Sequence, residues 1–301
     1  MALKDILAIV EPGDTVASQF AVAAAIAARH GAHLAGLCVV PPVNLSEAGL
    51  PWTGGTVNAR ALEQIQASLQ GTRTATMERL EAAFRKAAAD LVAPVEWRAP
   101  EGRPYEVAPM HARYADLAVI GQADPENPSR ASAGLIEAVL LGSGRPVVVV
   151  PYAGKFSAVG RCVMVAWNAS REAARALNDA MPFLEQAEKV IVLAVNPGRG
   201  SEGDDEPPPT PGAVFSADGQ GSWPAADIAH HLARHGVKAE AAYTVSGDLD
   251  VGNTLLSRAA ALGVDLIVMG GYGHSRAREV ILGGATRTIL ASMTVPVLMS
   301  H

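Results

Sequence analysis

Cysteine, aromatic residues and long apolar runs are all scarce in this chain. Of its 301 residues, two are cysteines and 5% are aromatic. A framework of disulfides is therefore excluded. No apolar run approaches the roughly 18 residues that a membrane span needs. The net charge is −6, and lysine and arginine form no dense cluster. We therefore expect no nucleic-acid partner and no association with a membrane, since both require such clusters.

Motifs of common hydrolases and transported proteins are missing as well. The chain has neither a Gly-x-Ser-x-Gly elbow nor a Gly-x-x-x-x-Gly-Lys-Ser/Thr loop. Its first residues enter a short apolar run without the pattern of a cleavable signal peptide, so we expect a cytoplasmic protein. Cys38 and Cys162 lie in apolar, strand-like runs, which is typical of small buried core residues.

The sequence contains one arrangement twice. Residues 6–42 and 162–198 both read as an apolar strand, a turn, an Ala-rich helix and a second apolar strand followed by proline. Later, residues 114–121 and 263–270 each place an aspartate before an apolar strand, and Pro146 and Pro296 each lead a closing strand. Apolar strands without alternation, separated by helices, predict parallel sheets covered on both faces. We therefore predict two tandem, doubly wound α/β domains.

Two irregular segments interrupt the pattern at corresponding points. Residues 41–61 contain several prolines and glycines, and residues 197–224 add acidic residues to them. The composition of residues 197–224 cannot bury a core, so this segment is predicted to be a mobile loop. A lid or a docking segment for a partner protein is a further hypothesis for residues 197–224.

Two glycine clusters predict an anion-binding site in the second copy. The apolar run 265–269 is followed by Gly270 and Gly273, which are expected to turn with positive φ and let the backbone approach a phosphate. Farther along, Gly283, Gly284 and Ala285 precede a predicted helix. Its first turn would offer free N–H groups and the Thr286 hydroxyl. Together the two clusters could hold a di- or triphosphate from two sides.

Residues 269–286, MGGYGHSRAREVILGGAT, resemble the nucleotide loop of the universal stress protein family. The family pattern is Gly, two residues, Gly, nine residues, Gly, and then Ser or Thr. Gly270, Gly273 and Gly283 match it. Gly284 stands at the Ser/Thr position, so one hydroxyl contact to the terminal phosphates is missing. Thr286 falls where many nucleotide-binding members have a second hydroxyl residue.

The resemblance covers nearly the whole chain and implies its fold. Each half would be an adenine nucleotide alpha hydrolase-like domain, with a five-stranded parallel sheet flanked by helices. Residues 1–152 would form a domain with a degenerate nucleotide loop, and residues 160–301 one with a nucleotide loop. The resemblance also implies that the two closing strands pair across a pseudo-twofold axis, as in a homodimer of the family. Further dimerisation of whole chains stays open.

The resemblance also implies the ligand, which would be ATP, ADP or AMP in the second domain. Whether Mg²⁺ accompanies the nucleotide stays open. Asn168 takes the position of the family's ribose-side acidic residue, which keeps a hydrogen-bonding group but removes a charge. The adenine side would be lined by Ala166, Trp167 and Val195. The loop residues Met269, Tyr272 and His274 complete the predicted site, with His274 either donating to a phosphate or standing in solvent.

The first copy departs from the same pattern. Asp124 replaces the second loop glycine and Glu126 adds another negative charge, so both would repel a polyphosphate. Pro125 and Pro128 each remove an N–H donor. Residues 133–136 replace the second glycine cluster. We therefore predict that the first domain is a structural partner without a ligand.

Three functions are weighed on these observations. The first is a stress-response regulator that binds ATP, ADP or AMP in its second domain, with slow ATP hydrolysis at most and no assigned catalytic residue. The second is a nucleotide-free scaffold that acts through contacts with an unidentified protein, which Gly284 and Asn168 favour. The third, an adenylating ligase, requires a glycine loop at the first strand that residues 167–172 lack. His231 and His235 have helical spacing suited to a metal, but without a third ligand they are interpreted as a solvated helix face.

Overall fold

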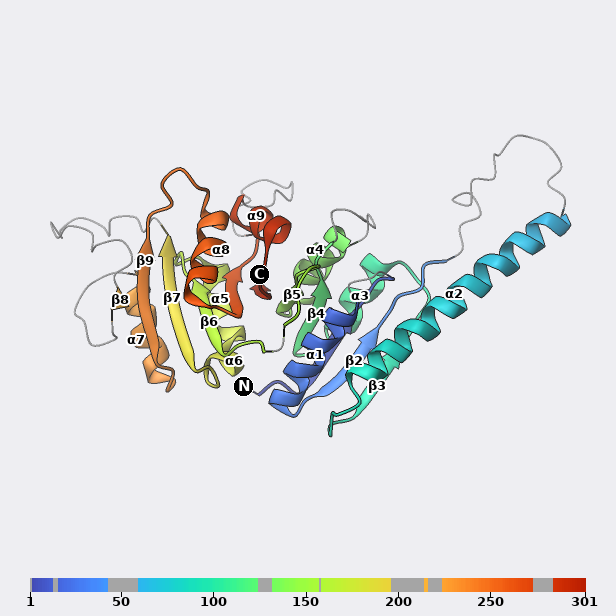
Figure 1. The fold of residues 1–301 in the computed structure, drawn as a ribbon, viewed down its shortest axis with the longest axis horizontal. Helices are drawn as coiled ribbons and strands as arrows, with labels where there is room; N and C mark the ends of the chain where they lie inside the picture. Colours follow the sequence, from blue (N-terminus) through green and yellow to red (C-terminus); the bar gives the residue numbers. More distant parts are fainter. Residues whose placement is uncertain are drawn as a thin grey trace.

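The strands of both repeats join into one continuous sheet (Figure 1). It is seen in a computed structural model that describes residues 2–12, 16–42, 59–123, 132–156, 158–195, 214–215, 224–272 and 284–301. The strand order is β3-β2-β1-β4-β5-β11-β10-β6-β7-β9-β8. The sheet therefore crosses the boundary between the two halves without interruption.

The first half contributes five parallel strands. They are β1 (Asp5–Ile9), β2 (His33–Leu37), β3 (Val95–Arg98), β4 (Leu117–Gly121) and β5 (Val147–Val150). All neighbouring pairs among them are parallel. β5 is buried at every position, as expected of a strand that is covered by helices on both faces.

The second half repeats this order of strands. They are β6 (Cys162–Ala166), β7 (Lys189–Val195), β9 (Ala239–Thr244), β10 (Leu266–Gly270) and β11 (Val297–Ser300). A short strand, β8 (Val214–Phe215), pairs antiparallel with β9 at the outer edge and was not predicted. The predicted fold class is confirmed, with two five-stranded parallel sheets merged into one larger sheet. The predicted limits of the two domains stay a prediction.

Helices cover both faces of the sheet. The first half supplies α1 (Val16–His30), α2 (Ala59–Ala87), α3 (Pro104–Ala112) and α4 (Ser132–Ser143). The second supplies α5 (Arg171–Asp179), α6 (Met181–Leu184), α7 (Pro224–Arg234), α8 (Val251–Leu262) and α9 (Gly284–Ser292). One core packs beneath α1, α2, α5, α6 and α7, and the other beneath α3, α4, α8 and α9. No helix in the described part of the chain is long and apolar enough to cross a membrane.

The closing strands of the two halves pair with each other. β5 and β11 run antiparallel, with Val148 opposite Leu298 at the middle of the pairing. The predicted pairing across a pseudo-twofold axis is therefore confirmed. It removes the two bare strand edges that separate domains would leave in water.

An aspartate fixes the start of the first strand in each half. The Asp116 carboxylate accepts hydrogen bonds from the backbone N–H groups of Lys4 at 2.7 Å and Asp5 at 3.1 Å. The Asp265 carboxylate accepts three, from Gly160 at 2.9 Å, Arg161 at 3.0 Å and Cys162 at 3.1 Å. The aspartate that precedes β4 or β10 therefore ties that strand to the start of β1 or β6.

The two cysteines differ in their burial. Cys38 is fully buried, and burial together with the charge of Glu11 raises the pKa of its thiol to about 12. Cys162 is only partly buried at the first residue of β6, and burial followed by the charge of Asp265 raises its pKa. The expectation of a buried core cysteine is thus correct for Cys38 and wrong for Cys162, because the end of a strand stays accessible to solvent.

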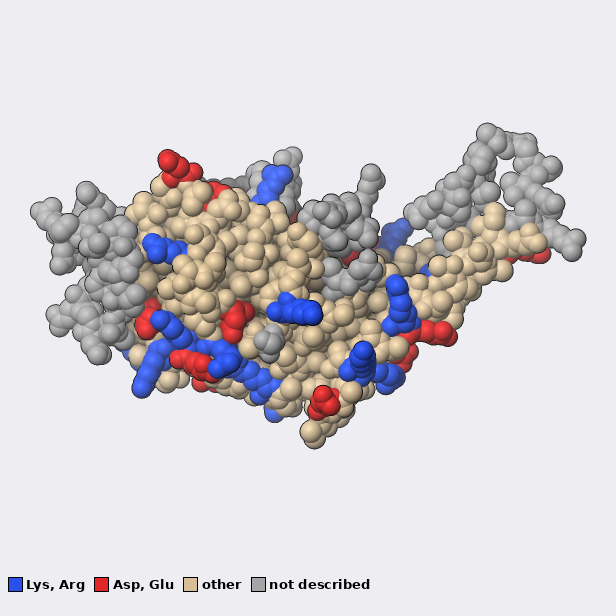
Figure 2. Space-filling view, viewed as in Figure 1, with Lys and Arg blue, Asp and Glu red and all other residues tan. Residues whose placement is uncertain are grey.

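Charges of both signs lie side by side on the face shown in Figure 2. In the second half, Arg161 pairs with Glu188 at 2.7 Å and Lys189 pairs with Glu240 at 3.0 Å. Pairs of this kind leave little net positive potential around them. The expectation that no nucleic acid binds stays a prediction.

Candidate functional site

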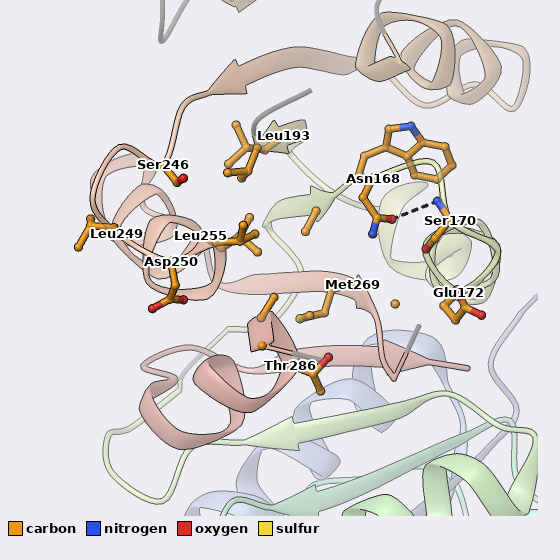
Figure 3. A pocket seen from close by; sticks show the side chains of 17 residues that line it. Asn168, Ser170, Glu172, Leu193, Ser246, Leu249, Asp250, Leu255, Met269 and Thr286 are labelled. Carbon is orange, nitrogen blue, oxygen red and sulfur yellow. Dashed lines mark hydrogen bonds between the residues drawn. The ribbon is translucent and has the colours of Figure 1, made fainter. Parts of the chain in front are cut away.

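A pocket of about 510 Å³ opens at the carboxyl ends of the strands in the second half (Figure 3). In an open parallel sheet this edge is where ligands bind, because helix N-termini point toward it. The lining comes from the ends of β6, β7 and β10, from residues 246–250 after β9, and from the beginnings of α5, α8 and α9.

The structure brings nine of the residues predicted from the sequence together around this pocket. They are Ala166, Trp167, Asn168, Val195, Met269, Gly270, Gly284, Ala285 and Thr286. Three others, Gly273, His274 and Gly283, lie outside the described residues. Whether the nine bind a nucleotide stays a prediction, but they come from four separate segments of the chain and converge on one cavity.

Gly270 is required at its position for a reason other than the predicted one. It does not adopt positive φ. A Cβ atom there would lie 2.6 Å from the backbone nitrogen of Ala173 and 2.6 Å from the carbonyl carbon of Glu172. The first turn of α5 packs directly on the end of β10, so only glycine fits. The expectation of a positive φ at Gly270 is therefore wrong.

Tyr272 has the positive φ of this segment, at 60°, and it does not line the pocket. Its side chain is 6% exposed, and burial together with the charge of Glu137 on α4 raises its pKa to about 12. Tyr272 is therefore not among the described residues that line the pocket. Its predicted part in nucleotide binding stays a prediction.

Three helices begin at the pocket. α5 is capped by Ser170, whose hydroxyl oxygen accepts a hydrogen bond from the Ala173 N–H at 3.1 Å. α8 is capped by Asp250, whose carboxylate accepts one from the Asn253 N–H at 3.0 Å. α9 begins at Gly284, where a Cβ atom would meet no atom of the described residues within 4 Å. The described residues therefore leave room at the start of α9.

Asn168 shapes the turn between β6 and α5. Its side-chain oxygen accepts a hydrogen bond from the backbone N–H of Ser170 at 3.1 Å, and Ala169 between them has a φ of 57°. An Asx turn of this kind holds the chain where it leaves the strand. Asn168 therefore has a structural task in addition to any contact with a ligand.

Two carboxylates line the pocket on opposite sides in Figure 3. Burial alone raises the pKa of Glu172, but hydrogen bonds from its own backbone N–H and from Arg171 outweigh this effect and hold the pKa below its ordinary value. The backbone N–H of Asn253 lowers the pKa of Asp250, and the Thr288 hydroxyl adds to the effect. Both groups are therefore ionised at neutral pH. Among the described lining residues there is no lysine or arginine, so this wall opposes phosphate charge.

Eight lining residues were missed by the sequence reasoning. They are Ser170, Glu172, Leu193, Ser246, Leu249, Asp250, Val251 and Leu255. Two of them carried a signal, because Ser170 and Asp250 stand where an N-cap is expected before a helical pattern. Glu172, Val251 and Leu255 have no local signature, since only the packing of α5 and α8 brings them to the pocket. Leu193 lies in β7, and Ser246 and Leu249 follow β9.

The corresponding corner of the first half is filled by a side chain. Gln19 on α1 is 4% exposed, and its amide donates hydrogen bonds to the carbonyl oxygens of Ile9 at 2.6 Å and Val119 at 3.0 Å. Its amide oxygen would lie 3.1 Å from a Cβ atom on Gly121. The ends of β1 and β4 are therefore joined by a glutamine. Asp124 and Glu126, which were predicted to repel a polyphosphate, belong to residues 124–130 and lie outside the part of the chain that the structure describes.

The histidines on α7 are close to each other. The rings of His231 and His235 have centroids 4.8 Å apart. Within the ranges that the structure describes, no group of three or more His, Cys, Asp or Glu side chains could hold a metal ion. Whether Mg²⁺ accompanies a nucleotide stays a prediction.

Comparison with known proteins places this geometry in a family. The sequence model of the universal stress protein family matches residues 161–301, while no curated protein matches the chain. A universal stress protein from Archaeoglobus fulgidus DSM 4304 has a similar structure, with 16% identity, coverage of 98% of this chain and 96% of its own, and a TM-score of 0.60. The second half is thus a universal stress protein domain.

A second solved structure extends the likeness over both halves. A putative universal stress protein from Pseudomonas aeruginosa UCBPP-PA14 is 14% identical, covers 99% of this chain and 93% of its own, and has a TM-score of 0.52. Likeness at such identities shows the fold alone. Together with the repeated strand order, it shows that the first half shares the fold of the second, while the family match itself covers residues 161–301.

Proposed function

We propose that the second half binds an adenine nucleotide, ATP, ADP or AMP, in the pocket and that the protein is a stress-response regulator with little or no catalysis. The observation that carries the proposal is the convergence of nine predicted residues and three helix starts on one cavity. Because no described atom lies within 4 Å of a Cβ atom on Gly284, the first turn of α9 is the favoured position for a phosphate.

The chemistry of the lining supports a nucleotide in one orientation. Apolar side chains at the ends of β6, β7 and β10 suit the faces of a purine, and they are supplied by Ala166, Leu193, Val195 and Met269. Polar groups of Asn168 and Ser246 suit a ribose. Thr286 lies 4% exposed in the first turn of α9, beside the proposed phosphate position.

Mass spectrometry of the purified, denatured protein tests the proposal directly. We expect a released adenine nucleotide or, for protein stripped of ligand, a saturable calorimetric signal with AMP, ADP or ATP. Incubation with ATP should release ADP slowly at most. A protein that carries no nucleotide and gives no heat with any of the three at millimolar concentration would contradict the proposal.

A nucleotide-free scaffold is the second candidate, and specific features favour it. Gly284 supplies no hydroxyl, and Glu172 and Asp250 both carry negative charge into the pocket. Such a protein would act through contacts with another protein. The calorimetric experiment separates the two candidates, since the scaffold gives no signal.

Replacing Gly284 with serine should strengthen nucleotide binding about threefold to tenfold, the effect of one added hydrogen bond of ordinary strength. No described atom would clash with a Cβ atom at this position. Isothermal titration with AMP and ATP measures the change. Gly284→Ala is the matched control, because it adds the Cβ atom without the hydroxyl and should leave the affinity as it is. Equal affinities for the two variants would contradict the assigned phosphate position.

A further inference from the structure

We propose that Gln122, in the first half of the molecule, is a positioning residue for the ligand site of the second half. It fixes helix α9, whose first three residues line the pocket. The inference rests on the proposed function for its binding readout, but its structural consequence can be measured without a ligand.

Gln122 follows β4 and is 4% exposed. Its side-chain nitrogen donates a hydrogen bond to the carbonyl oxygen of Leu290 at 2.8 Å, across the seam between the halves. Its side-chain oxygen accepts one from the backbone N–H of Tyr152 at 3.1 Å. Both ends of the amide are thus engaged, which fixes its orientation.

The bond to Leu290 supplies a partner that α9 cannot supply itself. The last four carbonyl groups of a helix have no partner within it. Leu290 is the third residue from the end of α9, so its carbonyl belongs to this set. Gln122 therefore satisfies an otherwise open acceptor of the helix with a donor from the other half.

Positions related by the pseudo-twofold axis can be compared, and the hydrogen bond from Gln122 to Leu290 has no counterpart at the equivalent position of the second half. The N–H of Gln122 donates to the carbonyl of Val150 at 2.7 Å, and the N–H of Gly271 donates to that of Ser300 at 2.9 Å. Gln122 and Gly271 are therefore equivalent positions, each at the end of the fourth strand of its half. One has a long side chain that reaches across the seam, and the other has none.

At the equivalent position in the second half, Gly271 meets the first half through van der Waals packing against α4. A Cβ atom on Gly271 would lie 2.9 Å from a methyl carbon of Leu140 on α4. Leu140 and Leu290 are themselves equivalent, since they lie six residues before Pro146 and Pro296. Gln122 thus binds the backbone of α9, while Gly271 lets α4 pack onto the segment that leads into the glycine loop.

α9 is held from two directions as a result. A Cβ atom on Gly252, at the start of α8, would lie 2.6 Å from Cβ of Thr288, so α8 packs tightly against α9 on one side. Gln122 holds the helix from the first half. Loss of the Gln122 contact frees one of these two restraints, and the start of the helix moves relative to the rest of the pocket.

Gln122→Met tests the inference, because it keeps the length of the side chain and removes both polar groups. We expect hydrogen exchange of the α9 amides to accelerate about tenfold. The dissociation constant for AMP should rise about threefold to tenfold, within the range for one lost hydrogen bond. Adenosine should bind as before, because its proposed contacts come from the ends of β6, β7 and β10 and from Ser246 after β9, and not from α9. A general loss of structure would weaken both ligands alike.

Gln19→Met is the matched control. Gln19 is equally buried and also donates to backbone carbonyls, but its partners Ile9 and Val119 lie within the first half. We expect this variant to lower the stability of the first half and to leave α9 exchange and the AMP-to-adenosine ratio unchanged. If Gln122→Met does not fold, Gln122→Asn keeps the amide on a chain one methylene shorter and serves for the same comparison.

Unchanged α9 exchange in the Gln122 variant would overturn the inference. A parallel loss of AMP and adenosine binding would also overturn it, since the effect would then not be confined to α9. If the wild-type protein binds no nucleotide, the proposed function is contradicted, but the inference about Gln122 is not. The exchange of the α9 amides then decides the positioning role of Gln122 alone.

Discussion

Replacing Gly270 with alanine should lower the free energy of unfolding by about 2–3 kcal/mol, as overpacking of a close-packed site does, and should abolish nucleotide binding. The added Cβ atom would lie 2.6 Å from backbone atoms of both Glu172 and Ala173. Backbone atoms cannot rotate away as a side chain can, so the first turn of α5 must shift. Because this turn lines the pocket, stability and binding fall together. Chemical denaturation and calorimetry with AMP measure the two effects.

Gly284→Ala provides the comparison within the same pocket. Among the described residues, no atom lies within 4 Å of its added Cβ, and alanine is the better helix former by roughly 1 kcal/mol in a helix interior. This variant should be as stable as the wild type or slightly more stable. The two glycines belong to one sequence pattern, but only Gly270 is enforced by packing. Equal stability of the two alanine variants would disprove the close contact with α5.

Replacing Asp265 with alanine should lower the free energy of unfolding by about 2 kcal/mol, because three backbone N–H groups lose a charged acceptor at once. They belong to residues 160–162, where the chain enters the second half. Loss of the carboxylate should therefore loosen the start of β6. Urea denaturation gives the stability, and hydrogen exchange shows where the structure opens.

The pseudo-equivalent Asp116 is the matched control for Asp265. It accepts only two backbone hydrogen bonds, from Lys4 and Asp5 at the start of β1. Asp116→Ala should cost about 1 kcal/mol and should loosen the first half alone. An Asp265 variant within about 0.5 kcal/mol of the wild type, the usual range of a neutral surface change, would contradict the clamping role.

The sheet could be predicted from the sequence because its strands are buried on both faces. The run Val147–Val150 has no polar alternation, and this pattern requires helices on both sides. The pairing of β5 with β11 followed from the resemblance to a dimer. The strand β8 could not be predicted, because Val214 and Phe215 lie in a segment rich in proline and glycine whose pairing depends on β9.

The site could be predicted where residues end a strand or lie just beyond its end, as Gly270 and Asn168 do. Strand ends meet at one edge of a parallel sheet, so their neighbours are known without coordinates. Glu172 and Leu255 face the pocket only because of how their helices pack, which no short pattern records. The burial of Tyr272, which is 6% exposed, likewise has no signature in the sequence.

The pairing of β5 with β11 also fixes the stoichiometry of the two halves. Both strands belong to one polypeptide, so their association is unimolecular and dilution does not separate them, unlike two subunits in equilibrium. Each half always meets the other and never a second copy of itself at this seam. Substitutions can therefore accumulate on one side only, as Gln122 opposite Gly271 illustrates. Any larger assembly must form through other surfaces of the molecule.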